Sequence, residues 1–322
     1  MSLLRIPMLL LIGSLLVSLE ARADKVVDTL ISNGRILTMN SGMVEYDRGF
    51  VAIKGHKIVA VGMQQNADEY SAKEVIDVDG DLIIPGLVNG HTHVSMTLLR
   101  SLGDDVPNRL HDYIFPLEKE FVTPAMVALG AELGNLEFIK GGVTTFADMY
   151  YFEDEVAKVV DDSGLRAILG QTVIKYLRAD APTPQDAINA TLKFAQKYQD
   201  HERITAAFAL HGPYTNSTEI LQQIARLSLA HDIPVLMHLA ESKVEQQTIA
   251  KRAGGLSPIA YMNDIGALNH NLIGAHVIIA DHQDRELLKK HDVGVIHNIS
   301  ANIKSARSVA PVIEMLEQGI DV

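Results

Sequence analysis

Histidines gather at the ends of the predicted strands. Of the 13 histidines in the chain, six lie at or just beyond the carboxyl end of such a strand: His91, His93, His211, His238, His276 and His297. In a closed barrel of parallel strands these ends meet at one mouth, where active sites of this architecture are built. Other histidines, such as His201 and His231, fall on predicted helices or loops, and we expect them to be solvated. The pattern therefore predicts one site lined by imidazoles.

His91-Thr92-His93 has the spacing of a metal-binding pair. Residues i and i+2 of a strand lie on the same face, so both imidazoles can point into a barrel and bind one cation. An isolated H-x-H pattern is more often two polar residues at a strand end. Here residues 85–90 lead directly into the pair and later predicted strands also end in histidine, which favours the metal site.

The segment His238-Leu239-Ala240-Glu241 supplies two further groups. His238 ends a predicted strand and offers a third nitrogen ligand, Glu241 is placed to move protons, and His276 ends the next strand. Three nitrogen ligands with an open position for water describe a catalytic site rather than a structural one. A metal there lowers the pKa of water toward about 7, and Glu241 can pass the released proton to a leaving nitrogen. Three imidazoles suit one divalent ion, zinc by default, with iron, nickel or cobalt as alternatives.

Beyond Pro85 the chain alternates strands with helices, which predicts a parallel sheet of β/α units. The predicted strands are 87–93, 143–149, 166–173, 204–211, 234–239, 272–279 and 294–297. Thr123-Pro124 and Thr183-Pro184 each place a capping hydroxyl before a proline at a helix start. Residues 319–322 are expected to begin an eighth strand. No Gly-rich phosphate loop follows the first strand, so a (β/α)8 TIM barrel, ending at the start of strand 8, is favoured over an open doubly wound sheet.

Residues 24–83 precede the barrel and carry short strands separated by Gly and Asn turns. The predicted strands are 29–31, 35–39, 49–54, 57–61 and 74–78. Gly55-His56 and Asp79-Gly80 have turn chemistry. We interpret this segment as the N-terminal part of a small β-sandwich, and residues 84–322 as the barrel.

Composition narrows the range of partners. A chain of 322 residues with 47% hydrophobic content can bury a large core. The net charge of -12 repels phosphate backbones and anionic lipids, so we expect a small-molecule substrate rather than nucleic acid. The chain has no cysteine, which excludes disulfides and thiolate metal ligands.

The first 23 residues have the layout of a secretory signal peptide. Arg5 precedes an apolar run, residues 6–19, and Ala21-Arg22-Ala23 forms an A-x-A cleavage site ahead of Asp24. The run is shorter than the roughly 20 apolar residues that span a bilayer, which makes an uncleaved anchor the weaker alternative. We expect export to a periplasm or the medium, without membrane association after cleavage.

Taken together, five motifs resemble the amidohydrolase superfamily, in the branch of adenosine-derivative, guanine and cytosine deaminases and triazine hydrolases. They are PGLVNGHTH at 85–93, HGPYT at 211–215, HLAE at 238–241, AH at 275–276 and HN at 297–298. Residues 96–105 are most similar to the methylthioadenosine/S-adenosylhomocysteine deaminase group.

The resemblance implies a role for each candidate residue. His91, His93 and His238 would bind the metal, Glu241 would shuttle protons, and His276 would hold the attacking hydroxide or the substrate. Glu118, His211 and His297 would line the substrate pocket, with Glu118 placed where some relatives contact a ribose. Many such barrels are homo-oligomers, which the resemblance implies here as well.

Three features depart from the family pattern. Relatives carry a Thr-Asp-Gly motif at strand eight whose aspartate completes the metal site, whereas this sequence ends at Val322. Ile299 and Ala301 stand where relatives often have proline and serine, and Gln171 stands where some have arginine. We therefore expect a truncated chain of reduced or absent activity.

Hydrolytic deamination of a purine, pyrimidine or related heterocycle is the leading hypothesis. A triazine-type hydrolase that breaks a C–Cl or C–N bond would use the same residues. An inactive metal-binding fragment is the third reading, because of the missing aspartate.

Overall fold

A computed structural model describes residues 25–104, 106, 109–176 and 179–322, and divides the chain into two compact units after Pro85. The expected signal peptide, residues 1–23, lies outside the described residues. Across the described residues, none of the helices combines the length and apolar character that a membrane crossing requires.

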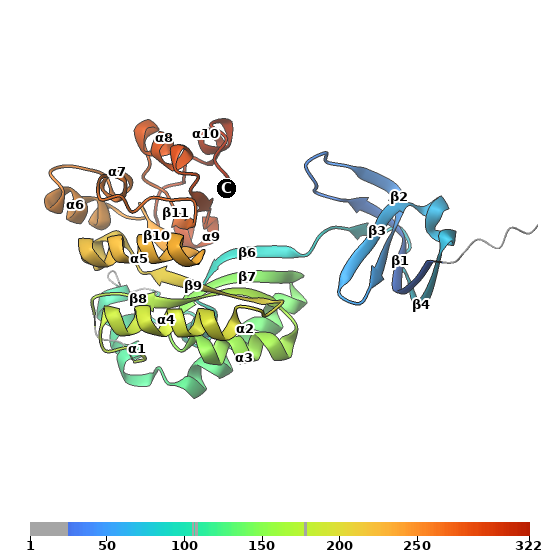
Figure 1. Ribbon diagram of the computed structural model, residues 1–322, viewed down its shortest axis with the longest axis horizontal. Helices are drawn as coiled ribbons and strands as arrows, with labels where there is room; N and C mark the ends of the chain where they lie inside the picture. Colours follow the sequence, from blue (N-terminus) through green and yellow to red (C-terminus); the bar gives the residue numbers. More distant parts are fainter. Residues whose placement is uncertain (1–24, 105, 107–108, 177–178) are drawn as a thin grey trace, which may run out of the picture. The chain divides into compact units, whose positions relative to one another are not determined.

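The first unit is a five-stranded sheet with the order β3-β2-β1-β4, in which β5 also pairs with β1 (Figure 1). Its elements are β1 (Lys25–Leu37), β2 (Glu45–Lys54), β3 (Lys57–Met63), η1 (Gln64–Glu69), β4 (Tyr70–Asp77) and β5 (Leu82–Ile83). β2 runs antiparallel to β1 and β3, whereas β4 and β5 run parallel to β1. A small core of Val27, Leu30, Phe50, Ala52 and Ala67 holds the unit together.

One strand prediction in this unit is wrong. Residues 29–31 and 35–39 were expected to be separate strands, but β1 runs through both. Asn33 adopts a left-handed conformation with φ of 65°, and the pairing with β2 shifts register on both sides of Gly34. The Asn-Gly pair therefore makes a β-bulge, which bends a strand without ending it. The hairpin predicted at Gly55-His56 is confirmed, because Lys54 pairs with Lys57 across it.

The second unit is a sheet of seven parallel strands whose spatial order follows the sequence, from β6 to β12 (Figure 1). The strands are β6 (Leu87–Thr92), β7 (Val143–Tyr150), β8 (Arg166–Val173), β9 (Ile204–Leu210), β10 (Val235–Leu239), β11 (Leu272–His276) and β12 (Gly294–Ile296). The helices are η2 (Val94–Leu99), η3 (Leu110–Ile114), α1 (Phe115–Phe121), α2 (Pro124–Lys140), α3 (Glu153–Ser163), α4 (Pro184–Tyr198), η4 (Pro213–Thr215), α5 (Thr218–His231), α6 (Lys243–Arg252), α7 (Pro258–Asp264), α8 (His282–Lys290), α9 (Ile299–Lys304) and α10 (Val312–Glu317).

Local chemistry starts the helices where the sequence predicts. The Thr123 hydroxyl accepts a hydrogen bond from the Met126 amide at the start of α2. At the start of α4, Thr183 and Asp186 form a reciprocal capping box. Both threonines precede the proline that opens the helix, so two of the predicted helix starts are confirmed.

The sheet curves until its first and last strands approach each other. A Cβ added to Gly90 in β6 would lie 2.6 Å from Cδ1 of Ile296 in β12. A side chain at position 90 would require Ile296 to shift, and the predicted TIM-barrel class is confirmed as a nearly closed barrel. The eighth strand predicted at 319–322 is not formed. That segment accepts one backbone hydrogen bond from β12, donated by the Val295 amide to the Asp321 carbonyl at 2.9 Å.

The predicted strand 272–279 also ends early. β11 stops at His276, because His276 and Val277 take φ angles of 76° and 41°. These left-handed angles interrupt the extended chain at the residue that the sequence singled out for chemistry.

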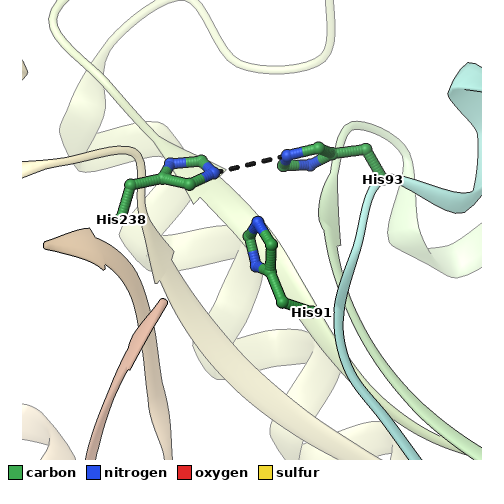
Figure 2. Close-up of side chains that lie close together, drawn as sticks. All are labelled: His91, His93 and His238. Atoms are coloured by element: carbon green, nitrogen blue, oxygen red, sulfur yellow. Dashed lines mark hydrogen bonds between the residues drawn. The ribbon is translucent and has the colours of Figure 1, made fainter. Parts of the chain in front are cut away.

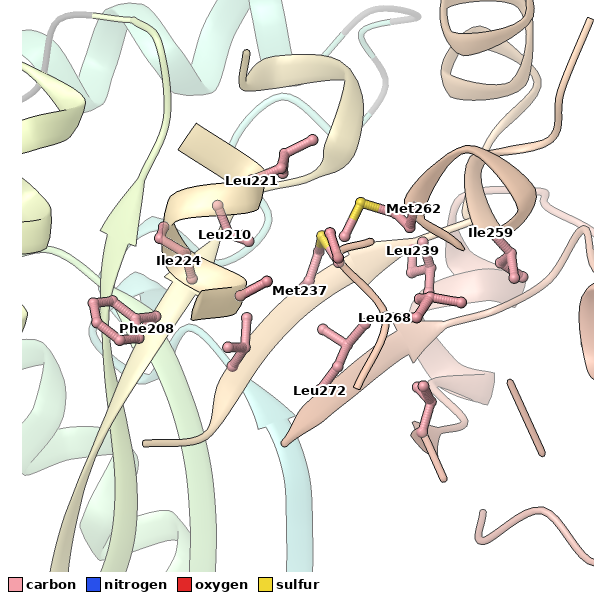
Figure 3. Packing of buried hydrophobic residues seen from close by; sticks show 14 of the residues in the cluster. Phe208, Leu210, Leu221, Ile224, Met237, Leu239, Ile259, Met262, Leu268 and Leu272 are labelled. Carbon is pink, nitrogen blue, oxygen red and sulfur yellow. The ribbon is translucent and has the colours of Figure 1, made fainter. Parts of the chain in front are cut away.

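The largest core cluster joins β9 and β10 to the helices outside them (Figure 3). Phe208 and Met237 are fully buried on neighbouring strands, and Leu221 and Ile224 of α5 belong to the same cluster. This packing fixes the strand that carries His238, because any displacement of β10 would open a void in a close-packed interior.

Truncating this core is expected to destabilise the barrel. Leu221→Ala removes a fully buried side chain and should lower the free energy of unfolding by about 2–5 kcal/mol in urea titrations. Leu229→Ala, on the same helix but 52% exposed, is the matched control and should change it by about 0.5 kcal/mol or less. Equal effects of the two variants would show that this cluster does not stabilise the fold.

Candidate metal centre and active site

Three imidazoles from two distant strands converge at the carboxyl ends of β6 and β10 (Figure 2). One ring nitrogen each from His91, His93 and His238 lies within 4.8 Å of the other two. The closest approach joins Nε2 of His93 to Nε2 of His238, at 3.3 Å. His91 and His93 project together because they are two residues apart around the end of β6, as the H-x-H spacing predicts.

Backbone carbonyls set the tautomer of two of these rings. Nδ1 of His93 lies 2.7 Å from the Met149 carbonyl oxygen, and Nδ1 of His238 lies 2.6 Å from that of His211. A carbonyl only accepts, so each Nδ1 carries the proton and donates it. Burial lowers the pKa of His93, and burial together with the neighbouring imidazoles lowers the pKa of His238, which keeps both rings neutral. Both Nε2 atoms therefore face each other as bare lone pairs.

This arrangement fits a divalent cation. Two lone pairs at 3.3 Å repel each other unless a positive charge lies between them. Two nitrogens that bind one zinc ion tetrahedrally, at about 2.0–2.1 Å each, stand about 3.3 Å apart. Carbonyl partners on the outer nitrogens are also the usual means by which proteins orient metal-binding histidines.

Glu241 and His276 form the next layer of the site. Nε2 of His276 lies 3.3 Å from Oε1 of Glu241, and its Nδ1 lies 2.8 Å from Oδ1 of Asn302. The amide oxygen accepts from Nδ1, so a neutral His276 presents a lone pair to the carboxylate. Burial lowers the pKa of His276. A proton on either partner would turn this contact into a hydrogen bond.

Arg307, in the loop between α9 and α10, contacts Oε1 of Glu241 through its guanidinium. Its own amide donates to the carbonyl of Asn302 in α9 at 2.9 Å, so α9 and the loop after it carry the partners of His276 and Glu241. Sequence reasoning missed Arg307 and Asn302, because they lie outside the motifs on which it relied.

Glu245 is a third residue that sequence reasoning missed. It is buried, and its carboxylate accepts from the amides of Ala240 at 3.1 Å and Glu241 at 2.8 Å. Burial raises the pKa of Glu245 to about 8. Ala240 has φ of 51°, so Glu245 holds the sharp turn that carries Glu241. The spacing Ser242-x-x-Glu245 is a capping-box pattern and was a usable signal.

The three candidate substrate residues have different surroundings. The Glu118 carboxylate accepts from the Tyr150 hydroxyl at 3.0 Å and the Tyr151 hydroxyl at 3.4 Å, and burial raises its pKa to about 7. His211 joins the cluster, with its ring centroid 5.1 Å from that of His238. His297 follows β12, and its Nδ1 is buried without a hydrogen-bond partner among the described residues.

Gln171 is buried at the end of β8, where its amide donates to the Asp180 carboxylate. An arginine there would carry a charge. Gln171 carries none, so this position cannot form an ion pair with an anionic substrate group.

Comparisons with known proteins agree with this geometry. Residues 82–322 match the amidohydrolase family. The 5-methylthioadenosine/S-adenosylhomocysteine deaminase of Syntrophobacter fumaroxidans is 35% identical over 298 residues, covering 92% of this chain and 68% of the relative. An adenosine deaminase from Xanthomonas campestris, solved with bound zinc, is 28% identical with a TM-score of 0.88, covering 92% of this chain and 68% of that one. An atrazine chlorohydrolase from Arthrobacter aurescens, complexed with zinc, shares the fold at 20% identity and a TM-score of 0.79, covering 91% and 70%.

The chain belongs to the amidohydrolase family. The predicted class, a metal-dependent hydrolytic deaminase that acts on carbon–nitrogen bonds of small molecules, is confirmed at the level of this family and its deaminase relatives. The chain spans about two thirds of the length of the relatives that it matches.

Removing the H-x-H pair is expected to abolish metal binding. His91→Ala/His93→Ala deletes two of the three clustered ligands, so zinc retained after dialysis, measured by elemental analysis, should fall from near one equivalent to background. His231→Ala/His282→Ala removes two exposed imidazoles and should retain wild-type zinc. Equal zinc in both double variants would place the metal elsewhere.

Proposed function

We propose that this chain is a zinc-dependent deaminase of adenine nucleosides, of the kind represented by 5′-methylthioadenosine and S-adenosylhomocysteine. The facing Nε2 atoms of His93 and His238, 3.3 Å apart, carry the proposal, because this contact is favourable only around a cation. The names of the relatives supply the substrate class.

In this proposal His91, His93 and His238 hold the ion. Bound zinc makes a water molecule acidic enough to lose a proton near neutral pH. No carboxylate joins this histidine cluster among the described residues, so the three imidazoles are the ligands that this part of the chain offers.

Glu241 is the proposed proton carrier. Its Oε1 lies 3.3 Å from Nε2 of His276, so a proton can sit on either partner. Glu241 would take a proton from the attacking water and return it to the departing amino group. His276, fixed by Asn302, would keep the carboxylate aimed during both transfers.

Glu118 is proposed to contact the ribose. Tyr150 and Tyr151 fix its carboxyl group, and a pKa raised to about 7 by burial allows it both to donate and to accept near neutral pH. Sugar hydroxyls need partners of this kind. His211 and His297 would line the remainder of the pocket.

A kinetic comparison tests this function. Glu241→Gln keeps the shape of the side chain but cannot carry the proton, so kcat for ammonia release from 5′-methylthioadenosine should fall by about 10²–10⁴-fold with little change in KM. Glu286→Gln, at a 65% exposed side chain, should keep wild-type kinetics.

The substrate panel separates the alternatives. Release of chloride from a chlorotriazine, with no ammonia from any nucleoside, would favour the triazine hydrolase. Stoichiometric zinc with neither product would favour an inactive metal-binding fragment. Ammonia release that is unchanged in Glu241→Gln would contradict the assigned proton carrier.

We also propose that the protein is exported, on the strength of Arg5, the apolar run at 6–19 and the A-x-A site. N-terminal sequencing of protein from the periplasm or medium should begin at Asp24. Ala21→Glu/Ala23→Glu should block cleavage and leave the longer chain. Full-length wild-type protein confined to the cytoplasm would contradict export.

A further inference from the structure

Two buried carboxyl groups lie against each other behind the metal centre. Asp148, near the end of β7, is 0% exposed, and Glu153, the first residue of α3, is 1% exposed. Their side chains are hydrogen-bonded to each other. Oδ2 of Asp148 and Oε2 of Glu153 receive no N–H or hydroxyl hydrogen bond from any described residue. These two oxygens are therefore the ones that remain to form the carboxyl–carboxyl bond.

Such a bond requires at least one proton on the two carboxyl groups, since two carboxylates have no donor between them. Burial raises the pKa of Asp148, and burial together with the charge of Asp148 raises the pKa of Glu153 well above its usual value. Glu153 also has a backbone partner. Its other oxygen, Oε1, accepts from the Tyr150 amide at 2.8 Å.

The other oxygen of Asp148, Oδ1, is hydrogen-bonded to the segment that carries a candidate ligand. Oδ1 accepts from the Thr92 hydroxyl at 2.7 Å and from the Val94 amide at 2.6 Å. These residues flank His93 on both sides. The residue after Asp148 is Met149, whose carbonyl accepts from Nδ1 of His93. One short stretch of β7 thus fixes both the backbone and the ring of His93.

We propose that Asp148 and Glu153 act as a proton-sharing pair that positions His93 for the metal. Both are positioning residues, because they act through Thr92, Val94 and His93 and touch neither metal nor substrate. The inference rests on the proposed zinc site. It adds the two residues that hold the geometry of that site. An ionised Asp148 without a partner would be costly to bury. It would move toward solvent, and residues 92–94 would shift with it.

Amide substitutions test the shared proton in a double-variant cycle. In Asp148→Asn, Oδ1 still accepts from Thr92 and Val94 while the new NH2 donates to an ionised Glu153. In Glu153→Gln, Oε1 still accepts from Tyr150 while the new NH2 donates to Asp148. Each single variant keeps a donor facing an acceptor, so zinc affinity, measured by chelator competition, should fall by about threefold or less.

The double variant Asp148→Asn/Glu153→Gln places two NH2 groups against each other. Its zinc affinity should fall by about 10–100-fold, far more than the two single effects combined. Melting of the metal-free proteins reports whether each variant is folded. Additive losses, or a double variant with wild-type affinity, would overturn the shared-proton pair.

A further variant keeps the inference testable if the double variant does not fold. Thr92→Val removes the hydroxyl that donates to Asp148 while preserving the branched shape, and should weaken zinc binding by about tenfold. Thr205→Val, at an exposed strand position, is the matched control and should not. Unchanged affinity in Thr92→Val would overturn the positioning role. Wild-type protein that binds no zinc would instead reject the metal site itself, before any variant is compared.

Discussion

The geometry of the site depends on one contact, in which two imidazole nitrogens face each other without a proton between them. Each ring gives its single proton to a backbone carbonyl on its far side, so the near sides of His93 and His238 are left as lone pairs. The folded chain must either tolerate that repulsion or bind a cation. Strand positions and ring orientations both determine the geometry of this one contact.

The support for that contact lies mainly in neighbouring strands rather than in the ligands themselves. β7 supplies the Met149 carbonyl and the Asp148 carboxylate on one side, and the residue after β9, His211, supplies a carbonyl on the other. Glu245 holds the turn that carries Glu241 in the same way. Parallel strands end at the same edge of the sheet, so groups at one strand end can hydrogen-bond to a side chain of the neighbouring strand. This fixes the side chains at the mouth of the barrel, where active sites of this architecture lie.

How much the sequence predicted depended on whether a feature was local. The pairing of His91 with His93 follows from strand alternation, and the α4 start follows from Thr183 and the proline after it, so both were predictable. Asn33 was misjudged because an Asn-Gly pair makes a turn or a bulge according to the neighbouring strand, which is tertiary information. Arg307 was missed because its reach to Glu241 depends on the path of a loop, for which no periodicity exists.

The metal ligands also lie far apart along the chain: His93 and His238 are separated by 145 residues. Bringing them together means closing a long loop, which is entropically costly and slow for a barrel dominated by distant contacts. The cluster exists only once the strands from β6 to β10 have assembled, so ion capture follows folding instead of starting it. Binding then stabilises the finished barrel by mass action. The supply of the ion therefore shifts the equilibrium toward the assembled barrel, and has little influence on how fast that barrel first forms.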